Sequence, residues 1–280
     1  MKHIITVITA LVLGPLAVLC AADAFPGHQT NHHGVALYHV SFNGGAAEVL
    51  VPEQPAPGRP WVLAPSLYDP NSPVLGNMAR TELELVKRGF HIVAFGVGNT
   101  FGAPDSLVKW DAVYDAMTTR HGLSKRVSLL GVSREGLPIA RWAAAHPGRV
   151  ACLYMDKAVC DFKSWPGGKL GVGKGSPRDW QSLIPLYHFK TETEAMAYDQ
   201  NPVDLAPKLA ADKVAIIYVT GETDDAVPYS ENGARMEEAY KKAGAAYQVI
   251  RHPGEGHHPH GLADPSPVVE FILKYTGRPQ

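Results

Sequence analysis

Short apolar runs alternate with amphipathic stretches from residue 61 to the end of the chain. The apolar runs lie at 61–66, 90–97, 126–133, 150–156, 213–221 and 246–252. Stretches with helical spacing of apolar residues separate or follow them, at 77–89, 104–122, 136–148, 229–244 and 265–277. Short, continuous apolar runs between amphipathic helices are typical of parallel strands that are covered on both faces. The pattern therefore predicts an α/β fold with a mostly parallel sheet.

Two earlier segments follow a different pattern. Residues 35–42 and 46–53 alternate apolar and polar positions on either side of Asn43-Gly44, which predicts a hairpin of antiparallel edge strands. Together with the apolar runs, the hairpin gives a sheet of about eight strands. Since no repeat or low-complexity linker interrupts the pattern, residues 25–280 are interpreted as one domain.

One long segment breaks the alternation between the sixth and seventh predicted strands. It is rich in Gly, Pro, Trp and Tyr and extends over residues 161–212. A structureless loop of this length is rare inside a compact domain. We expect a small insertion, or lid, with short helices at Trp180–Tyr187 and Glu192–Tyr198.

The N-terminus has the order of a secretory signal peptide over residues 1–24. Lys2 precedes an apolar run from Ile4 to Leu19, and small residues follow it. Cleavage after Ala22 or Ala24 would give a periplasmic or secreted protein. A lipoprotein anchor on Cys20 is the less favoured alternative, because lipoprotein signals prefer a small residue at the position of Leu19.

Composition narrows the function classes. The chain has 280 residues and a formal net charge of -1, which gives no reason to expect nucleic acid or an anionic membrane as a partner. No later segment has the apolar length that a membrane span needs. Signal cleavage would leave Cys152 and Cys160, which we expect to be buried thiols rather than a disulfide.

The candidate chemistry begins at Ser133, in the stretch "LLGVSREGLPIARW". Ser133 follows an apolar strand and precedes a helix, and such a strand–turn–helix lifts a serine hydroxyl above the carboxyl edge of the sheet. Glu135 stands where the usual G-x-S-x-G pattern has its second glycine, and Gly136 follows it. Taken alone, the segment is also compatible with a serine that caps a buried helix.

A serine nucleophile needs a base and an acid, which follow it in the order acid, then histidine, in one large fold class. Asp224 comes just after the predicted strand 213–221, and His257 comes in a Gly-x-Gly-His turn after the last strand. Asp225 and Asp156 are the alternative acids. His258 and His260 are interpreted as loop residues near the mouth of the pocket, and a metal cluster with His257 is the less favoured alternative.

These motifs resemble the α/β-hydrolases over essentially the whole mature length. The elbow "GVSREG" is similar to the G-x-S-R-x-G pattern of exported bacterial carbohydrate esterases, among them the glucuronoyl esterases, although the lysine after the last glycine is absent here. The resemblance implies a serine esterase that cleaves a carbohydrate-linked carboxylic ester through an acyl-enzyme, without cofactor or metal. It also implies that the arginine at position 134 assists at the oxyanion; the other interpretation is a surface cation.

The remaining site residues follow from the same fold. The backbone N–H of Arg134 and that of Leu67 are the expected oxyanion donors, with Tyr68 as the alternative to Leu67. Trp165 and Trp180 in the insertion are candidates for substrate binding, or else they form the insertion's own core.

Two other functions fit this catalytic pattern less well. A serine peptidase of the prolyl-oligopeptidase type shares the domain, but its amino-terminal propeller could not fit in about forty residues. An inactive binding protein would be expected to lack one member of the Ser-His-Asp set, and all three are present.

Overall fold

The computed structural model describes residues 25–277, so the predicted signal peptide and Cys20 lie outside the described residues. A nine-stranded sheet forms the centre, in the order β1-β2-β3-β5-β4-β6-β7-β8-β9. The strands are β1 (His28–His32), β2 (Val35–Phe42), β3 (Gly45–Val51), β4 (Trp61–Ala64), β5 (His91–Ala94), β6 (Val127–Val132), β7 (Val150–Asp156), β8 (Ala215–Gly221) and β9 (Tyr247–His252). Strands β4 to β9 are parallel, which confirms a mostly parallel sheet.

The antiparallel edge contains one strand more than the sequence predicted. β2 and β3 form the expected hairpin, but β1 pairs antiparallel with β2 and extends the sheet at this edge. The residues of β1, HQTNH, have no apolar alternation, so hydrophobic patterning gives no sign of a strand there. Main-chain pairing with β2 forms it instead.

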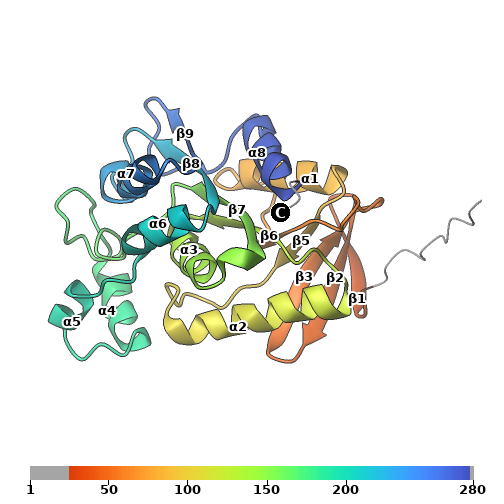
Figure 1. Ribbon diagram of the computed structural model, residues 1–280, viewed down its shortest axis with the longest axis horizontal. Coiled ribbons are helices and arrows are strands. Elements are labelled where there is room, and N and C mark those ends of the chain that lie inside the picture. The colour runs from red at the N-terminus through yellow and green to blue at the C-terminus, as the bar shows by residue number, and fades with distance from the viewer. Residues whose placement is uncertain (1–24, 278–280) are drawn as a thin grey trace, which may run out of the picture.

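Two layers of helices cover the sheet (Figure 1). The helices are α1 (Gly76–Lys87), α2 (Pro104–Asp115), α3 (Gly136–Ala145), α4 (Pro177–Leu186), α5 (Glu192–Met196), α6 (Pro202–Ala211), α7 (Gly233–Ala243) and α8 (Ser266–Thr276). α1 and α8 pack on one face of the sheet, and α2, α3, α6 and α7 pack on the other.

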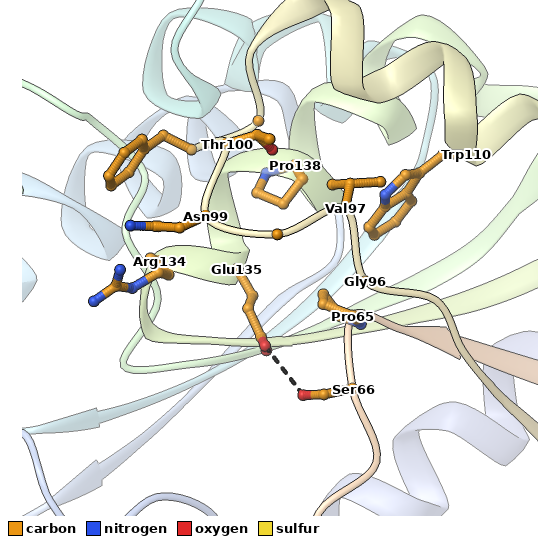
Figure 2. Close-up of a pocket in the computed structure, with 13 residues that line it drawn as sticks. Pro65, Ser66, Gly96, Val97, Asn99, Thr100, Trp110, Arg134, Glu135 and Pro138 are labelled. Atoms are coloured by element: carbon orange, nitrogen blue, oxygen red, sulfur yellow. Dashed lines mark hydrogen bonds between the residues drawn. The ribbon is translucent and has the colours of Figure 1, made fainter. Parts of the chain in front are cut away.

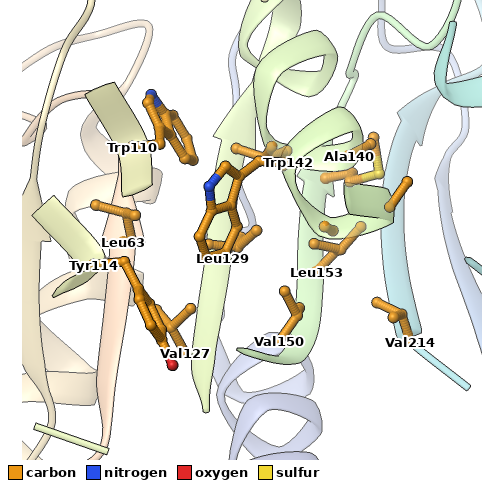
Figure 3. Close-up of a cluster of buried hydrophobic side chains, with 14 of the residues drawn as sticks. Leu63, Trp110, Tyr114, Val127, Leu129, Ala140, Trp142, Val150, Leu153 and Val214 are labelled. Carbon is orange, nitrogen blue, oxygen red and sulfur yellow. The ribbon is translucent and has the colours of Figure 1, made fainter. Parts of the chain in front are cut away.

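Alternation along the parallel strands divides the core between these two layers. Leu63, Leu129 and Leu153 face α2 and α3, where they join Trp110 and Trp142 (Figure 3). Their chain neighbours point the opposite way, into the cluster beneath α1 and α8. Both faces of the sheet are buried. We therefore expect the polar side chains that can reach a substrate at the carboxyl edge of the parallel strands.

The segment between β7 and β8 contains two short helices where the sequence predicted them, α4 and α5. Ser176 and Thr191 cap them by accepting hydrogen bonds from Asp179 N and Glu194 N. α4 and α5 lie outside the two main layers, at the left of Figure 1. α6, although inside the predicted insertion, packs in the main layer because its apolar face joins the same core as α3.

Among the described residues, no helix is long and apolar enough to cross a membrane. Cys152 and Cys160 are free and buried, as expected from their positions on and just after β7. Burial raises the pKa of the Cys152 thiol to about 12, so it stays protonated and unreactive at neutral pH.

Candidate active site

Ser133 lies at a sharp turn between β6 and α3. Its φ is +54°, in the left-handed region that a non-glycine residue rarely adopts. A single 3-10 turn over Ser133–Glu135 then leads into α3. Backbone strain of this kind concentrates at functional sites, because the surrounding structure must hold it in place.

Two glycines allow this turn to pack closely. A Cβ at Gly131 would lie 2.8 Å from Cδ1 of Ile139, and one at Gly136 would lie 2.6 Å from the carbonyl oxygen of Val159. Gly136 therefore permits the close approach between the new helix and the segment after β7. Glu135, which stands at the position of the usual second glycine, does not clash there because its side chain points into the protein.

Ser133, His257 and Asp224 form a continuous hydrogen-bonded chain. The hydroxyl Oγ of Ser133 is 2.9 Å from Nε2 of His257, and Nδ1 of His257 is 2.8 Å from Oδ2 of Asp224. The other oxygen of the Asp224 carboxylate accepts hydrogen bonds from the N–H groups of Ala226 and Val227, at 3.0 and 2.8 Å. The carboxylate is therefore fixed in the orientation that faces the imidazole.

The alternative acids have other partners. Asp225 is 62% exposed and pairs with Lys174, with 2.5 Å between Oδ2 and Nζ. Asp156 is fully buried, and its Oδ1 is 2.8 Å from Nδ1 of His260. In the described part of the chain, the carboxylate that is hydrogen-bonded to His257 is that of Asp224, and neither Asp225 nor Asp156 forms such a bond.

His260 differs from its sequence interpretation as a loop residue near the pocket mouth. It is buried beside Asp156, while His258 is exposed. One ring nitrogen from each of His257, His258 and His260 lies within 4.8 Å of the others, a set that could hold a metal ion. Both ring nitrogens of His257 are occupied by Ser133 and Asp224, so metal binding there would break that chain.

Lys157 anchors the loop that carries His257. This lysine follows β7, is 1% exposed, and donates from Nζ to the carbonyl oxygen of Pro259 at 2.6 Å and to Oε2 of Glu255 at 3.3 Å. The anchor holds the chain on both sides of His257. The sequence analysis missed it, because a lysine at the end of an apolar strand has no local pattern that predicts burial.

The candidate oxyanion donors lie on two segments. Arg134 is the second residue of the 3-10 turn, where the first N–H groups of a helical turn have no intrahelical acceptor. The N–H of Tyr68 donates to Oε2 of Glu82 at 3.2 Å, so it is already occupied. The N–H of Leu67 has no acceptor within residues 25–277, which favours Leu67 over Tyr68 as the second donor.

The Arg134 side chain lies on the insertion rather than on Glu135. Its guanidinium carbon is 4.7 Å from the centre of the Trp165 ring, and Nη1 is 3.7 Å from Oδ1 of Asp179. The side chain remains 43% exposed. Trp180, by contrast, is buried with Phe162 in the cluster where the insertion packs against Phe101 and Leu137, a placement that supports a packing role.

Beneath the turn, the Glu135 carboxylate joins two chain segments. It accepts hydrogen bonds from the N–H of Val132 at 2.9 Å, from the hydroxyl of Tyr68 at 2.7 Å and from that of Ser66 at 3.4 Å. Burial raises the pKa of the Glu135 carboxyl, against the lowering effect of these hydrogen bonds. Glu135 thereby ties the turn to the loop that carries Leu67.

Beside the turn lies a cavity of about 260 Å³ (Figure 2). The loop after β5, the start of α3 and the loop after β4 form its walls, and its lining includes Ser66, Val97, Trp110, Arg134 and Pro138. The sequence analysis assigned no role to the loop after β5. Its glycines in "GVGNTFG", at the carboxyl end of a parallel strand, were the available signal.

Several solved structures have a similar fold. The puromycin-hydrolyzing peptidase of Mycobacterium tuberculosis is 15% identical, with a TM-score of 0.63, over 92% of this chain and 40% of that one. The esterase of Pyrococcus furiosus is 15% identical, with a TM-score of 0.56, over 90% of this chain and 99% of that one. The fold is α/β-hydrolase-like. The fold class expected from the sequence is confirmed at this level.

The acylaminoacyl peptidase of Pyrococcus horikoshii is also similar, with a TM-score of 0.62 and 10% identity, over 90% of this chain and 42% of that one. The chain thus spans about 40% of the peptidase chains and nearly all of the esterase. No protein-family model and no curated protein sequence matches it. At these identities the likeness concerns the fold alone.

Proposed function

We propose that this protein is a serine hydrolase that cleaves a carboxylic ester through an acyl-enzyme. The observation that carries the proposal is the hydrogen-bonded chain from Ser133 through His257 to the buried Asp224. These residues have the separations that nucleophile, general base and orienting acid require. The fold similarity to an esterase and to serine-hydrolase-type peptidases supports a hydrolase in general.

In this mechanism, His257 takes the proton of the Ser133 hydroxyl as the oxygen attacks the ester carbonyl. The N–H groups of Arg134 and Leu67 stabilise the oxyanion of the tetrahedral intermediate. His257 then gives the proton to the leaving alcohol, and later activates the water that releases the acid. Asp224 holds Nδ1 of His257 protonated and stabilises the imidazolium that forms.

We propose that the ester is carbohydrate-linked. Arg134 and Trp165 stack beside the turn and present a cation and an aromatic face, a combination suited to a sugar or a uronate. The similarity to carbohydrate esterases in the elbow supports this choice, and the solved structures add nothing to it. No cofactor or metal takes part in the proposed steps.

A peptidase is the second candidate, because the chain has the fold of the puromycin-hydrolyzing and acylaminoacyl peptidases. Matched substrates separate the two functions. The purified protein should hydrolyse acetyl, methyl-uronate or aromatic acyl esters, and turnover should disappear in Ser133→Ala. Faster cleavage of aminoacyl anilides than of the matched aminoacyl esters would assign the peptidase instead.

A further inference from the structure

The cavity beside the Ser133 turn has a mostly apolar wall. Val97, Phe101, Trp110 and Pro138 contribute it, and Figure 2 shows Val97, Trp110 and Pro138 on the side away from the Glu135 carboxyl. Its volume of about 260 Å³ has room for roughly nine water-sized groups, at about 30 Å³ each. A flat ring with a short extension fits such a space.

One polar group of the wall lacks a partner. Trp110 is fully buried, and its Nε1–H has no hydrogen-bond acceptor in the part of the chain that the structure describes. Two other core tryptophans are satisfied: Nε1 of Trp61 donates to the carbonyl oxygen of Ser124 at 2.7 Å, and Nε1 of Trp142 donates to Oδ1 of Asp111 at 3.2 Å. Nε1 of Trp180 also lacks an acceptor among the described residues, but Trp180 does not line the cavity. A buried donor without an acceptor is unfavourable, so a small turn of the indole toward the cavity, which would let an oxygen of a ligand accept from Nε1–H, would strengthen binding.

The position of the cavity identifies which half of an ester it would receive. Its edge includes Ser66 and Arg134, the neighbours of the proposed oxyanion donor Leu67 and of Ser133. Ser133, Leu67 and His257 themselves do not line it, so the cavity begins beyond the reacting carbonyl, at the side of the oxyanion donors and away from the histidine that must protonate the leaving alcohol. The cavity therefore lies on the acyl side of the reacting carbonyl, and the alcohol leaves on the side of His257.

We propose that this cavity is an acyl subsite and that Trp110 Nε1 donates a hydrogen bond to an oxygen at the far end of the acyl group. The substrate class is an ester of a flat, largely apolar acid of roughly nine heavy atoms, such as a substituted aromatic acid with a terminal ether, hydroxyl or carbonyl oxygen. The inference rests on the proposed ester hydrolysis and adds its acyl specificity.

Pairs of isosteric esters test the hydrogen bond. 4-Nitrophenyl esters of 4-methoxybenzoic and 4-ethylbenzoic acid, and of 4-methoxycinnamic and 4-ethylcinnamic acid, differ within each pair only by an oxygen for a methylene. We expect the native protein to prefer the methoxy member of at least one pair by about tenfold in kcat/KM, the effect of one hydrogen bond. Trp110→Phe should bring that ratio close to that of the uncatalysed reaction.

Trp142→Phe is the matched control, because it also removes a buried indole from the same core but not from the cavity. It should keep the preference for the methoxy ester. The ratio within one variant is insensitive to how much of it is folded. The proposal is wrong if the native protein prefers neither methoxy ester, or if Trp110→Phe keeps the preference.

A second variant tests the volume of the cavity independently of the hydrogen bond from Trp110. Val97→Phe should fill it and lower the rate for the benzoyl ester, relative to the acetyl ester, by about tenfold. Cleavage of the acetyl ester that depends on Ser133, with an unchanged ratio in Val97→Phe, would overturn the subsite and leave ester hydrolysis intact. No turnover of any ester would overturn both.

Discussion

Two aspartate–histidine pairs lie at the carboxyl edge of this sheet, and their geometry is nearly the same. In each pair, Nδ1 of the histidine is 2.8 Å from a carboxylate oxygen: His257 with Asp224, and His260 with Asp156. Only His257 continues to a nucleophile, Ser133. The pair by itself is therefore no sign of a catalytic base.

The second pair has the surroundings of a structural clamp. Asp156 also accepts a hydrogen bond from the N–H of Gly261 at 3.0 Å, and the hydroxyl of Tyr154 is 3.2 Å from its Oδ2. His260 is 2% exposed, whereas the His257 side chain is 14% exposed. One loop thus carries a histidine that can meet substrate and a histidine that holds the loop to β7.

Replacing each histidine by glutamine should separate the two roles most strongly. We expect His257→Gln to lower kcat by roughly ten thousandfold or more, because proton transfer from Ser133 is lost, with little change in stability. His260→Gln should destabilise the protein by about 2 kcal/mol or more, because the buried Asp156 loses its partner. Steady-state kinetics and urea unfolding of both variants measure kcat and stability. Equal losses of kcat in the two variants would show that His257 and His260 do not have separate roles.

The carboxylates extend the comparison. Asp224→Asn should lower kcat by about a thousandfold or more, since an amide no longer fixes the tautomer of His257. Asp225→Asn is the matched control, as it removes the neighbouring, exposed carboxylate that pairs with Lys174. Asp156→Asn should affect the unfolding midpoint more than kcat. A loss at Asp225 as large as that at Asp224 would reassign the acid.

Lys157→Met tests how far the loop anchor matters for His257. The variant keeps the length and apolar stem of the side chain but loses the hydrogen bonds to Pro259 and Glu255. We expect kcat to fall by about tenfold, because a small misplacement of the base is costly, with KM nearly unchanged. Lys242→Met, an exposed lysine of α7, is the control. An unchanged kcat in Lys157→Met would show that the loop keeps its position without this anchor.

The last prediction concerns stability alone, at Glu82, whose buried carboxyl accepts a hydrogen bond from the N–H of Tyr68. Burial raises the pKa of the Glu82 carboxyl well above its usual value of 4.5, and its Oε1 has no hydrogen-bond partner in the described region. The folded protein therefore binds the proton more tightly than the unfolded chain, so stability falls as pH rises above about 4.5. Glu82→Gln, which still accepts from the N–H of Tyr68, removes this loss.

The difference in unfolding free energy between Glu82→Gln and the native protein should therefore grow in favour of the variant from pH 4.5 to 8. Urea unfolding at several pH values measures it. A difference that does not change with pH would show that Glu82 titrates normally.

The sequence predicted the elements that hydrophobic pattern and motif chemistry determine. The parallel strands, the hairpin and the places of Ser133, Asp224 and His257 after strands follow from local residues. β1 could not be predicted in this way, because backbone pairing forms it without apolar alternation. The burial of His260 and Lys157 depends on loops that meet only in the fold, and no local spacing encodes such contacts.

The central claim is that His257 activates Ser133, and labelling with a fluorophosphonate followed by intact-mass and peptide analysis tests it directly. Such a probe reacts with a serine only where a base activates it. We predict one phosphonyl adduct, on Ser133, in the native protein and in His260→Gln, and none in Ser133→Ala or His257→Gln. An adduct on another residue, or one that persists in Ser133→Ala, would contradict the account.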